Sequence, residues 1–235
     1  MARSEDYRSE LIALDRSSWP AYLSERSGVP GPRANLELLR AVADIGDLAT
    51  YDALIDTDDE YLTCCGVVGL GAELAARPDG RLLARLRAYA SDPRWRVREA
   101  VAMALQRLGD ADLDRLRSVV LDWADDPDPL VQRAAAAAIC EPRLLESAEA
   151  TATAVEVCQR VTSSLIRRPR TERRNADVRT LRRGLGYCWS VAVAADPVPG
   201  LAAFAALAVS TDPDVAWIVR ENRGKKRLAR LLQEP

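Results

Sequence analysis

The chain has 235 residues, 48% of them hydrophobic and 29% charged, and a formal net charge of −2 at pH 7. This composition excludes a disordered chain and is ordinary for a folded protein with a buried core. Histidine is absent, which excludes His-assisted nucleophiles, a histidine general base and H-E-x-x-H metal sites. Only 5% of the residues are aromatic, and the abundance of Ala, Leu, Val and Arg predicts an all-α chain.

The first 34 residues combine a charged start with a few apolar positions. Residues 1–19 lack the apolar run of a signal peptide, which predicts a cytoplasmic protein. Leu11, Trp19 and Leu23 lie at spacings that suggest one or two short helices. We expect these helices to cap the open end of whatever helical array follows.

From residue 35 the helical pattern is nearly continuous, with predicted helices at 35–45, 48–55, 61–76, 81–90 and 93–108. The last of these has the clearest ends. Asp92 is expected to accept hydrogen bonds from the first turn, and Pro93 to occupy the first helical position. Gly109 is expected to end the helix in the left-handed conformation.

A repeat becomes visible when the segment from residue 81 is shifted by 34 residues. Leu82 then falls on Leu116, and Asp92-Pro93 falls on Asp126-Pro127. A helical pair with this period buries its apolar stripe only by stacking on neighbouring pairs, so the repeat predicts a curved α-solenoid.

Beyond residue 142 we expect longer and less regular helices, at 150–166, 175–194, 199–209 and 213–232. Residues 184–211 carry only one charged side chain, Asp196. Pro197 and Pro199 interrupt this stretch, so it predicts two buried helices joined by a turn and no membrane span.

Residues 92–109 read D-P-x-W-x-V-R-E-A-x-A-x-A-L-x-x-L-G and resemble the second helix of HEAT-like repeats. The stretches SGVPGPRANLELL, GYCWSVAVAADP and DPDVAWIVRENRGKKRLARL are similar to those of an actinobacterial-type group of HEAT-repeat proteins. The resemblance implies one right-handed α-α superhelix of about five helical pairs over 1–235. In it, 1–34 form an N-terminal cap, 35–142 regular repeats, and 143–235 divergent repeats with a basic C-terminal cap.

The function that this resemblance implies is a binding scaffold without catalytic activity or cofactor, with a protein as the expected partner. HEAT-like alkylpurine DNA glycosylases have a similar architecture, and they imply DNA binding as the alternative. In those enzymes a Trp precedes a catalytic Asp by four residues. The nearest spacings here are Trp95 with Glu99 and Trp217 with Glu221, where Glu replaces Asp, so no catalytic role is transferred.

Charge is distributed unevenly along the chain. Residues 1–166 contain 19 basic and 28 acidic side chains, and residues 167–235 contain 14 basic and 7 acidic ones. Two clusters of basic side chains lie at 167–183 and 220–230. If they lie on the second helices of two neighbouring helical pairs, they could bind the same anionic ligand, with Trp217 or Trp189 as a flat surface beside it. The candidate ligand-binding residues are Arg94, Arg98, Arg179, Arg182, Arg183, Trp217, Arg220, Arg223, Lys225 and Lys226.

Several alternatives stay open for these residues. The arginines could form solvated faces that pair locally with Glu172, Asp177 or Glu221, or they could bind nucleic acid or a small phosphate- or carboxylate-bearing molecule. Trp95 and Trp217 are interpreted as wedges between repeats. The five cysteines have no C-x-x-C spacing and are expected to be buried thiols, with no metal bound.

Overall fold

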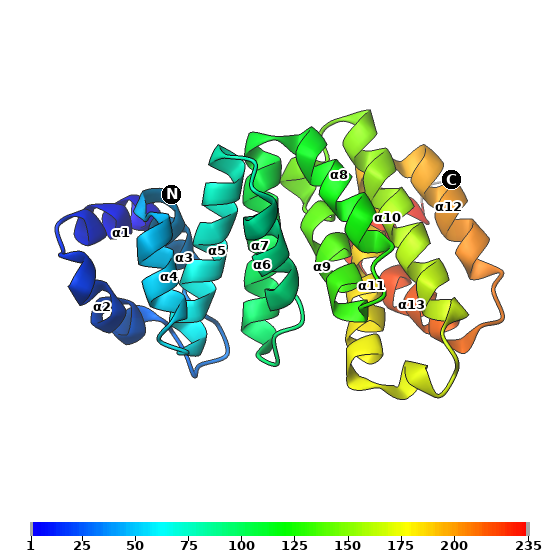
Figure 1. The fold of residues 1–235 in the computed structure, drawn as a ribbon. Helices are drawn as coiled ribbons and strands as arrows, with labels where there is room; N and C mark the ends of the chain where they lie inside the picture. The colour runs from blue at the N-terminus through cyan, green and yellow to red at the C-terminus, as the bar shows by residue number, and fades with distance from the viewer. Residues whose placement is uncertain (1, 234–235) are drawn as a thin grey trace. The chain divides into compact units, whose positions relative to one another are not determined.

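The computed structural model describes residues 2–233, with side chains from Glu5 onward. Over this part of the chain all regular structure is helical, and no strand is present. The chain divides into two compact units (Figure 1), unit 1 (Met1–Ala111) and unit 2 (Asp112–Pro235). The boundary falls within the segment expected to hold regular repeats, and a single domain over 1–235 stays a prediction.

Unit 1 contains seven α-helices among its described residues. They are α1 (Ala2–Ile12), α2 (Trp19–Arg26), α3 (Leu36–Ile45), α4 (Leu48–Ile55), α5 (Glu60–Ala76), α6 (Gly80–Tyr89) and α7 (Trp95–Ala111). A short 3₁₀ turn, η1 (Arg16–Ser18), connects α1 to α2. The helices predicted at 35–45, 48–55, 61–76 and 81–90 are confirmed to within about one residue, as are two short helices before residue 34.

Helix α5 is the centre of unit 1 and packs against α3, α4 and α7. Twelve of its seventeen residues are buried, because a helix that is apolar on every side must be covered on every side. Two glycines make the close approach possible. A Cβ on Gly69 would lie 2.2 Å from the ring of Tyr51 in α4, and one on Gly71 would lie 2.4 Å from the carbonyl oxygen of Ala104 in α7.

The ends of α7 differ from the prediction. The helix begins at Trp95, two residues after Pro93, and Gly109 lies buried inside its last turns, without a positive φ. Asp92 does accept a hydrogen bond from a backbone N–H, that of Arg94 at 2.7 Å, but this contact belongs to the turn before the helix. Gly109 is thus an interior residue of the helix, and the predicted left-handed C-cap is wrong.

Unit 2 also contains seven α-helices among its described residues. They are α8 (Leu113–Ala124), α9 (Pro129–Ile139), α10 (Ala148–Arg167), α11 (Ala176–Ala195), α12 (Pro197–Ala208), α13 (Pro213–Arg223) and α14 (Lys226–Leu231). Two 3₁₀ turns, η2 (Pro142–Leu144) and η3 (Glu172–Arg174), precede α10 and α11. Helix α11 is the centre of this unit and contacts α9, α10, α12, α13 and α14 (Figure 1).

The helices of both units form consecutive pairs, as the sequence predicted. The partners in contact are α4 with α5, α6 with α7, α8 with α9, α10 with α11, and α12 with α13. The all-α fold class, built from about five helical pairs, is therefore confirmed for the described residues. Asp126 and Asp212 each accept the backbone N–H two residues later, as Asp92 does, so the Asp-Pro step is a repeated turn.

The single helix predicted at 213–232 is wrong, because the chain turns at Gly224 and Lys225 between α13 and α14. The buried side chain of Asn222 lies just before this break. It donates to the carbonyl oxygens of Leu185 and Ile218, at 2.9 and 2.8 Å, and accepts from the N–H of Ser190 at 2.8 Å. Asn222 thereby connects the end of α13 to the middle of α11.

Helix α12 was expected to be buried, and only Gly200 and Phe204 in it are. Val198 and Val209 at its two ends are 84% and 81% exposed. Within unit 2, α12 packs against α10, α11 and α13, and these contacts leave most of its side chains uncovered. Over residues 2–233 no helix is both long and apolar enough to cross a membrane.

Candidate functional site: an arginine pocket in unit 2

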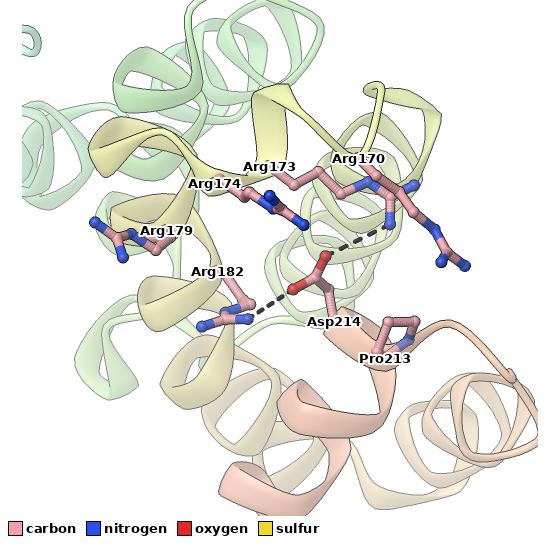
Figure 2. Close-up of a pocket in the computed structure, with 7 residues that line it drawn as sticks. All are labelled: Arg170, Arg173, Arg174, Arg179, Arg182, Pro213 and Asp214. Atoms are coloured by element: carbon pink, nitrogen blue, oxygen red, sulfur yellow. Dashed lines mark hydrogen bonds and ion pairs between the residues drawn. The ribbon is translucent and has the colours of Figure 1, made fainter.

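Helices α11 and α13 pack against each other and bring two distant parts of the sequence together. Beside their N-terminal ends lies an open pocket of about 400 Å³ (Figure 2). We call it the arginine pocket, and its lining residues are Arg170, Arg173, Arg174, Arg179, Arg182, Pro213 and Asp214. Five arginines and one carboxylate thus line the same pocket.

Two carboxylates at the start of α13 hold two of these arginines. Nη1 of Arg173 lies 2.6 Å from the carboxylate of Asp212, and Nη1 of Arg182 lies 2.6 Å from that of Asp214. Figure 2 shows Arg173 and Arg182 on either side of Asp214. Asp214 is thus an acidic residue of the pocket lining that holds two of the pocket arginines in position.

The Arg173–Asp212 pair is strongly coupled. Partial burial acts to raise the pKa of Asp212. The hydrogen bond and charge of Arg173, together with hydrogen bonds from the backbone N–H groups of Asp214 and Val215, outweigh it and leave that pKa below its ordinary value. The same hydrogen bond raises the pKa of Arg173. Nε of Arg173 also donates to the carbonyl oxygen of Arg168 at 2.8 Å, and its Nη2 donates to that of Ile166. Each guanidinium nitrogen of Arg173 therefore already donates a hydrogen bond within the protein, and the residue holds this wall of the pocket in place.

The other three arginines of the pocket differ from Arg173 and Arg182 because no carboxylate in the described part of the chain holds them. The side chains of Arg170, Arg174 and Arg179 are exposed and make no hydrogen bond or ion pair within residues 5–233. The local pairing with Glu172 and Asp177 that one alternative required does not occur among the described residues. These three guanidinium groups are free to meet a ligand.

Trp217 of α13 lies between Arg182 and Gly186 of α11, next to the pocket. The guanidinium carbon of Arg182 lies 4.7 Å from the centre of the Trp217 ring. The other edge of the ring rests against α11, where a Cβ on Gly186 would come within 2.9 Å of it. Trp217 is a half-buried wedge, as predicted, and it supports one of the pocket arginines.

Comparison with known proteins gives one family match. A model of HEAT repeats matches residues 67–140, which run from α5 through α9. HEAT repeats are thus found at residues 67–140. No curated protein matches.

Two crystal structures described as engineered proteins are similar in part. One is 18% identical, with 98% of each chain covered and a TM-score of 0.38; the other is 13% identical, with 86% of this chain and 99% of that chain covered and a TM-score of 0.31. At these scores the likenesses carry no conclusion on fold or function. HEAT repeats generally mediate protein interactions, and the arginine pocket lies outside the matched residues.

Two candidate residues, Arg94 and Arg98, belong to the HEAT repeats themselves. Arg94 forms ion pairs with Asp92 and Asp58, at 2.9 and 3.0 Å. Nη1 of Arg98 donates to the carbonyl oxygens of Asp92 and Pro93, at 2.6 and 3.0 Å. Both side chains thus stabilise the turn before α7, a use that the sequence pattern did not reveal.

The remaining basic candidates do not share the arginine pocket. Arg220 and Arg223 line a separate groove with Ala208, Ser210, Ala216 and Val219. Lys225 lies 6.0 Å from the ring centre of Tyr187, whereas Lys226 and Arg183 are exposed outside both sites. The expected single basic surface is therefore divided. Of the candidates, Arg179 and Arg182 line the arginine pocket, and Trp217 contacts Arg182.

The other tryptophans and the cysteines do not extend the site. Trp189 is fully buried and donates to the Thr162 hydroxyl at 3.0 Å, so it offers no flat surface to a ligand. Trp95 is 51% exposed, and its interpretation as a wedge is wrong. All five cysteines are buried thiols, and within the described residues no group of three or more Cys, Asp or Glu side chains could hold a metal ion.

Proposed function

We propose that this HEAT-repeat chain is a non-enzymatic binding scaffold and that its arginine pocket binds an acidic segment of a protein partner. The observation that carries the proposal is the meeting of five arginines in one pocket with a single lining carboxylate. Like charges held close together repel one another unless a counter-charge is supplied. Asp212 and Asp214 compensate Arg173 and Arg182 only.

An acidic peptide supplies what the pocket lacks. Guanidinium groups bind carboxylates through paired, charge-assisted hydrogen bonds. The three unpaired arginines extend from the connection before α11 into its first turns. This arrangement suits an extended segment that carries several carboxylates, and the general role of HEAT repeats in protein interactions supports a protein as its source.

The test is a direct titration of the full chain with a fluorescent acidic peptide and with its Gln-for-Glu counterpart. We expect only the acidic peptide to bind, with an affinity that falls as salt is raised. The double variant Arg174→Gln/Arg179→Gln is expected to weaken binding about tenfold or more, the loss of two charge-assisted contacts. The matched control is Arg167→Gln/Arg230→Gln, which removes two exposed arginines outside the pocket.

Three results would count against the proposal. The first is no binding of the acidic peptide, and the second is equal loss in the two double variants, which would indicate nonspecific attraction. The third is tighter binding of duplex DNA than of the peptide, lost in the pocket variant. That result would favour the DNA-binding alternative, which the basic balance of residues 167–235 motivates.

A further inference from the structure

We infer that the arginine pocket recognises a phosphate monoester on the partner, a phosphorylated side chain, in preference to a carboxylate. This inference rests on the proposed function and adds the chemical class of the group that enters the pocket. Three features of the pocket support the inference. They are its surplus of positive charge, the difference between arginines that are paired within the protein and arginines that are not, and its position beside a helix N-terminus.

The charge surplus exceeds what one carboxylate can neutralise. Five arginines and Asp214 line the pocket, and Asp212 compensates Arg173 from outside the lining. Three formal positive charges remain, on Arg170, Arg174 and Arg179. A phosphate monoester carries about −1.5 to −2 charges near pH 7 and three strong acceptor oxygens in one compact group. It therefore compensates more of this surplus than a carboxylate does.

The arginines differ in what they have left to donate. Arg173 has its donors committed to Asp212 and to two backbone carbonyl oxygens. Arg182 is held between the Asp214 carboxylate and the Trp217 ring. We assign both as positioning residues that set the wall of the pocket.

Arg174 and Arg179 are assigned as the ligands of the phosphoryl oxygens, with Arg170 at the rim. A guanidinium presents its N–H groups as a planar fork that matches two oxygens of one phosphate. Two forks and a rim arginine suit the three terminal oxygens of a phosphate monoester. Arg174 and Arg179 also flank the first turn of α11, whose N-terminal end carries positive partial charge and adds to the attraction.

The experiment compares one acidic peptide in three forms that differ only at a central residue, which is Ser, Glu or phosphoserine. The full chain is titrated with each form. We expect the phosphoserine form to bind about tenfold more tightly than the Glu form, which corresponds to about 1.4 kcal/mol. Arg174→Gln/Arg179→Gln removes this advantage, and Arg167→Gln/Arg230→Gln retains it. Because these arginine side chains have no partner within the described residues, their replacement does not lower the thermal unfolding midpoint.

The pH dependence gives a second readout. The second pKa of a phosphate monoester is about 6, whereas arginine stays charged throughout. The advantage of the phosphoserine form over the Glu form therefore shrinks as the pH falls from about 7.5 to about 5.5. A constant ratio over this range would overturn the inference.

The remaining outcomes separate the two proposals. Equal binding of the Glu and phosphoserine forms overturns the phosphate inference and leaves the proposed function intact. Failure of all three forms overturns both. Inorganic phosphate or a nucleoside monophosphate that displaces the phosphopeptide at equal concentration would assign the pocket to a free phosphate compound and overturn a phosphorylated partner as its source.

Discussion

The guanidinium carbon of Arg182 lies over the ring of Trp217, 4.7 Å from its centre, so a residue of α11 and one of α13 meet beside the arginine pocket. The contact joins the two helices that supply the pocket walls. Trp217 is half-buried and fills the space left by Gly186. Its ring is therefore part of the α11–α13 interface and also part of the support for a pocket residue.

Replacement of Trp217 tests this double role. We expect Trp217→Ala to lower the free energy of unfolding by about 1–3 kcal/mol through lost packing and lost cation–π contact. Trp95→Ala is the matched control, since Trp95 is 51% exposed and its loss should cost less than about 1 kcal/mol. Urea unfolding of both variants decides the matter, and equal losses would contradict the stacked arrangement.

The Arg173–Asp212 pair gives a prediction with a defined pH dependence. Burial raises the folded-state pKa of Asp212, but Arg173 and the backbone N–H groups of Asp214 and Val215 together lower it below its ordinary value. The charged carboxylate therefore stabilises unit 2 above the unfolded pKa of about 3.9. That stability is lost as the pH falls through the lower folded pKa. Asp212→Asn keeps an oxygen to cap α13 but removes the charge, and we expect a loss of about 1–2 kcal/mol at pH 7.

Chemical unfolding of the Asp212→Asn variant at several pH values checks this prediction. The difference from the wild type should be constant between about pH 5 and 7 and should shrink below about pH 4. Asp177→Asn is the control, because Asp177 is exposed and forms no ion pair within the described residues. A difference that grows toward acid pH would have the wrong sign.

The helical pairs could be predicted because their signals are local: apolar periodicity, Asp-Pro steps and glycine or proline breaks. The site could be predicted only in part. Arg182 and Arg220 both lie on helices with basic clusters, yet they face different grooves. Which face of α13 meets α11 depends on the fit of Trp217 against Gly186, a contact between distant residues that no periodicity contains.

Two further differences between the sequence prediction and the structure also arise from contacts between residues that are distant in the sequence. Asp214 follows an Asp-Pro start and is typical of a helix N-terminus, but its partners Arg173 and Arg182 come from other segments. The uncharged composition of α12 predicts burial, yet its neighbours bury only Gly200 and Phe204 in it. Local sequence specifies what a helix is made of, whereas the number of neighbours that it meets depends on its place in the stack.

Close packing of α5 on α7 predicts a large effect for a single methyl group. A Cβ at Gly71 would lie 2.4 Å from the backbone oxygen of Ala104 and 2.5 Å from its Cα. Because backbone atoms cannot step aside without moving α7, Gly71→Ala should destabilise the protein by about 3 kcal/mol. Gly80→Ala is the control, since nothing lies within 4 Å of its Cβ and helix propensity favours Ala there. Thermal unfolding should show a lower midpoint for the first variant and an equal or higher one for the second.

The five buried thiols should be unreactive in the folded protein. Burial is the main cause that raises the pKa of Cys64 to about 12, and it also raises the pKa of Cys65, which is fully enclosed. At pH 8 a pKa of about 12 leaves about one thiolate in ten thousand, and the thiolate is the reactive form. We therefore expect a disulfide reagent to modify no thiol rapidly in the native chain and all five cysteines after unfolding in guanidinium. Ala202→Cys, at an exposed position of α12, supplies a reactive thiol as the positive control. Rapid modification of the unaltered native chain would mean that the cores of the two units open far more often than their packing implies.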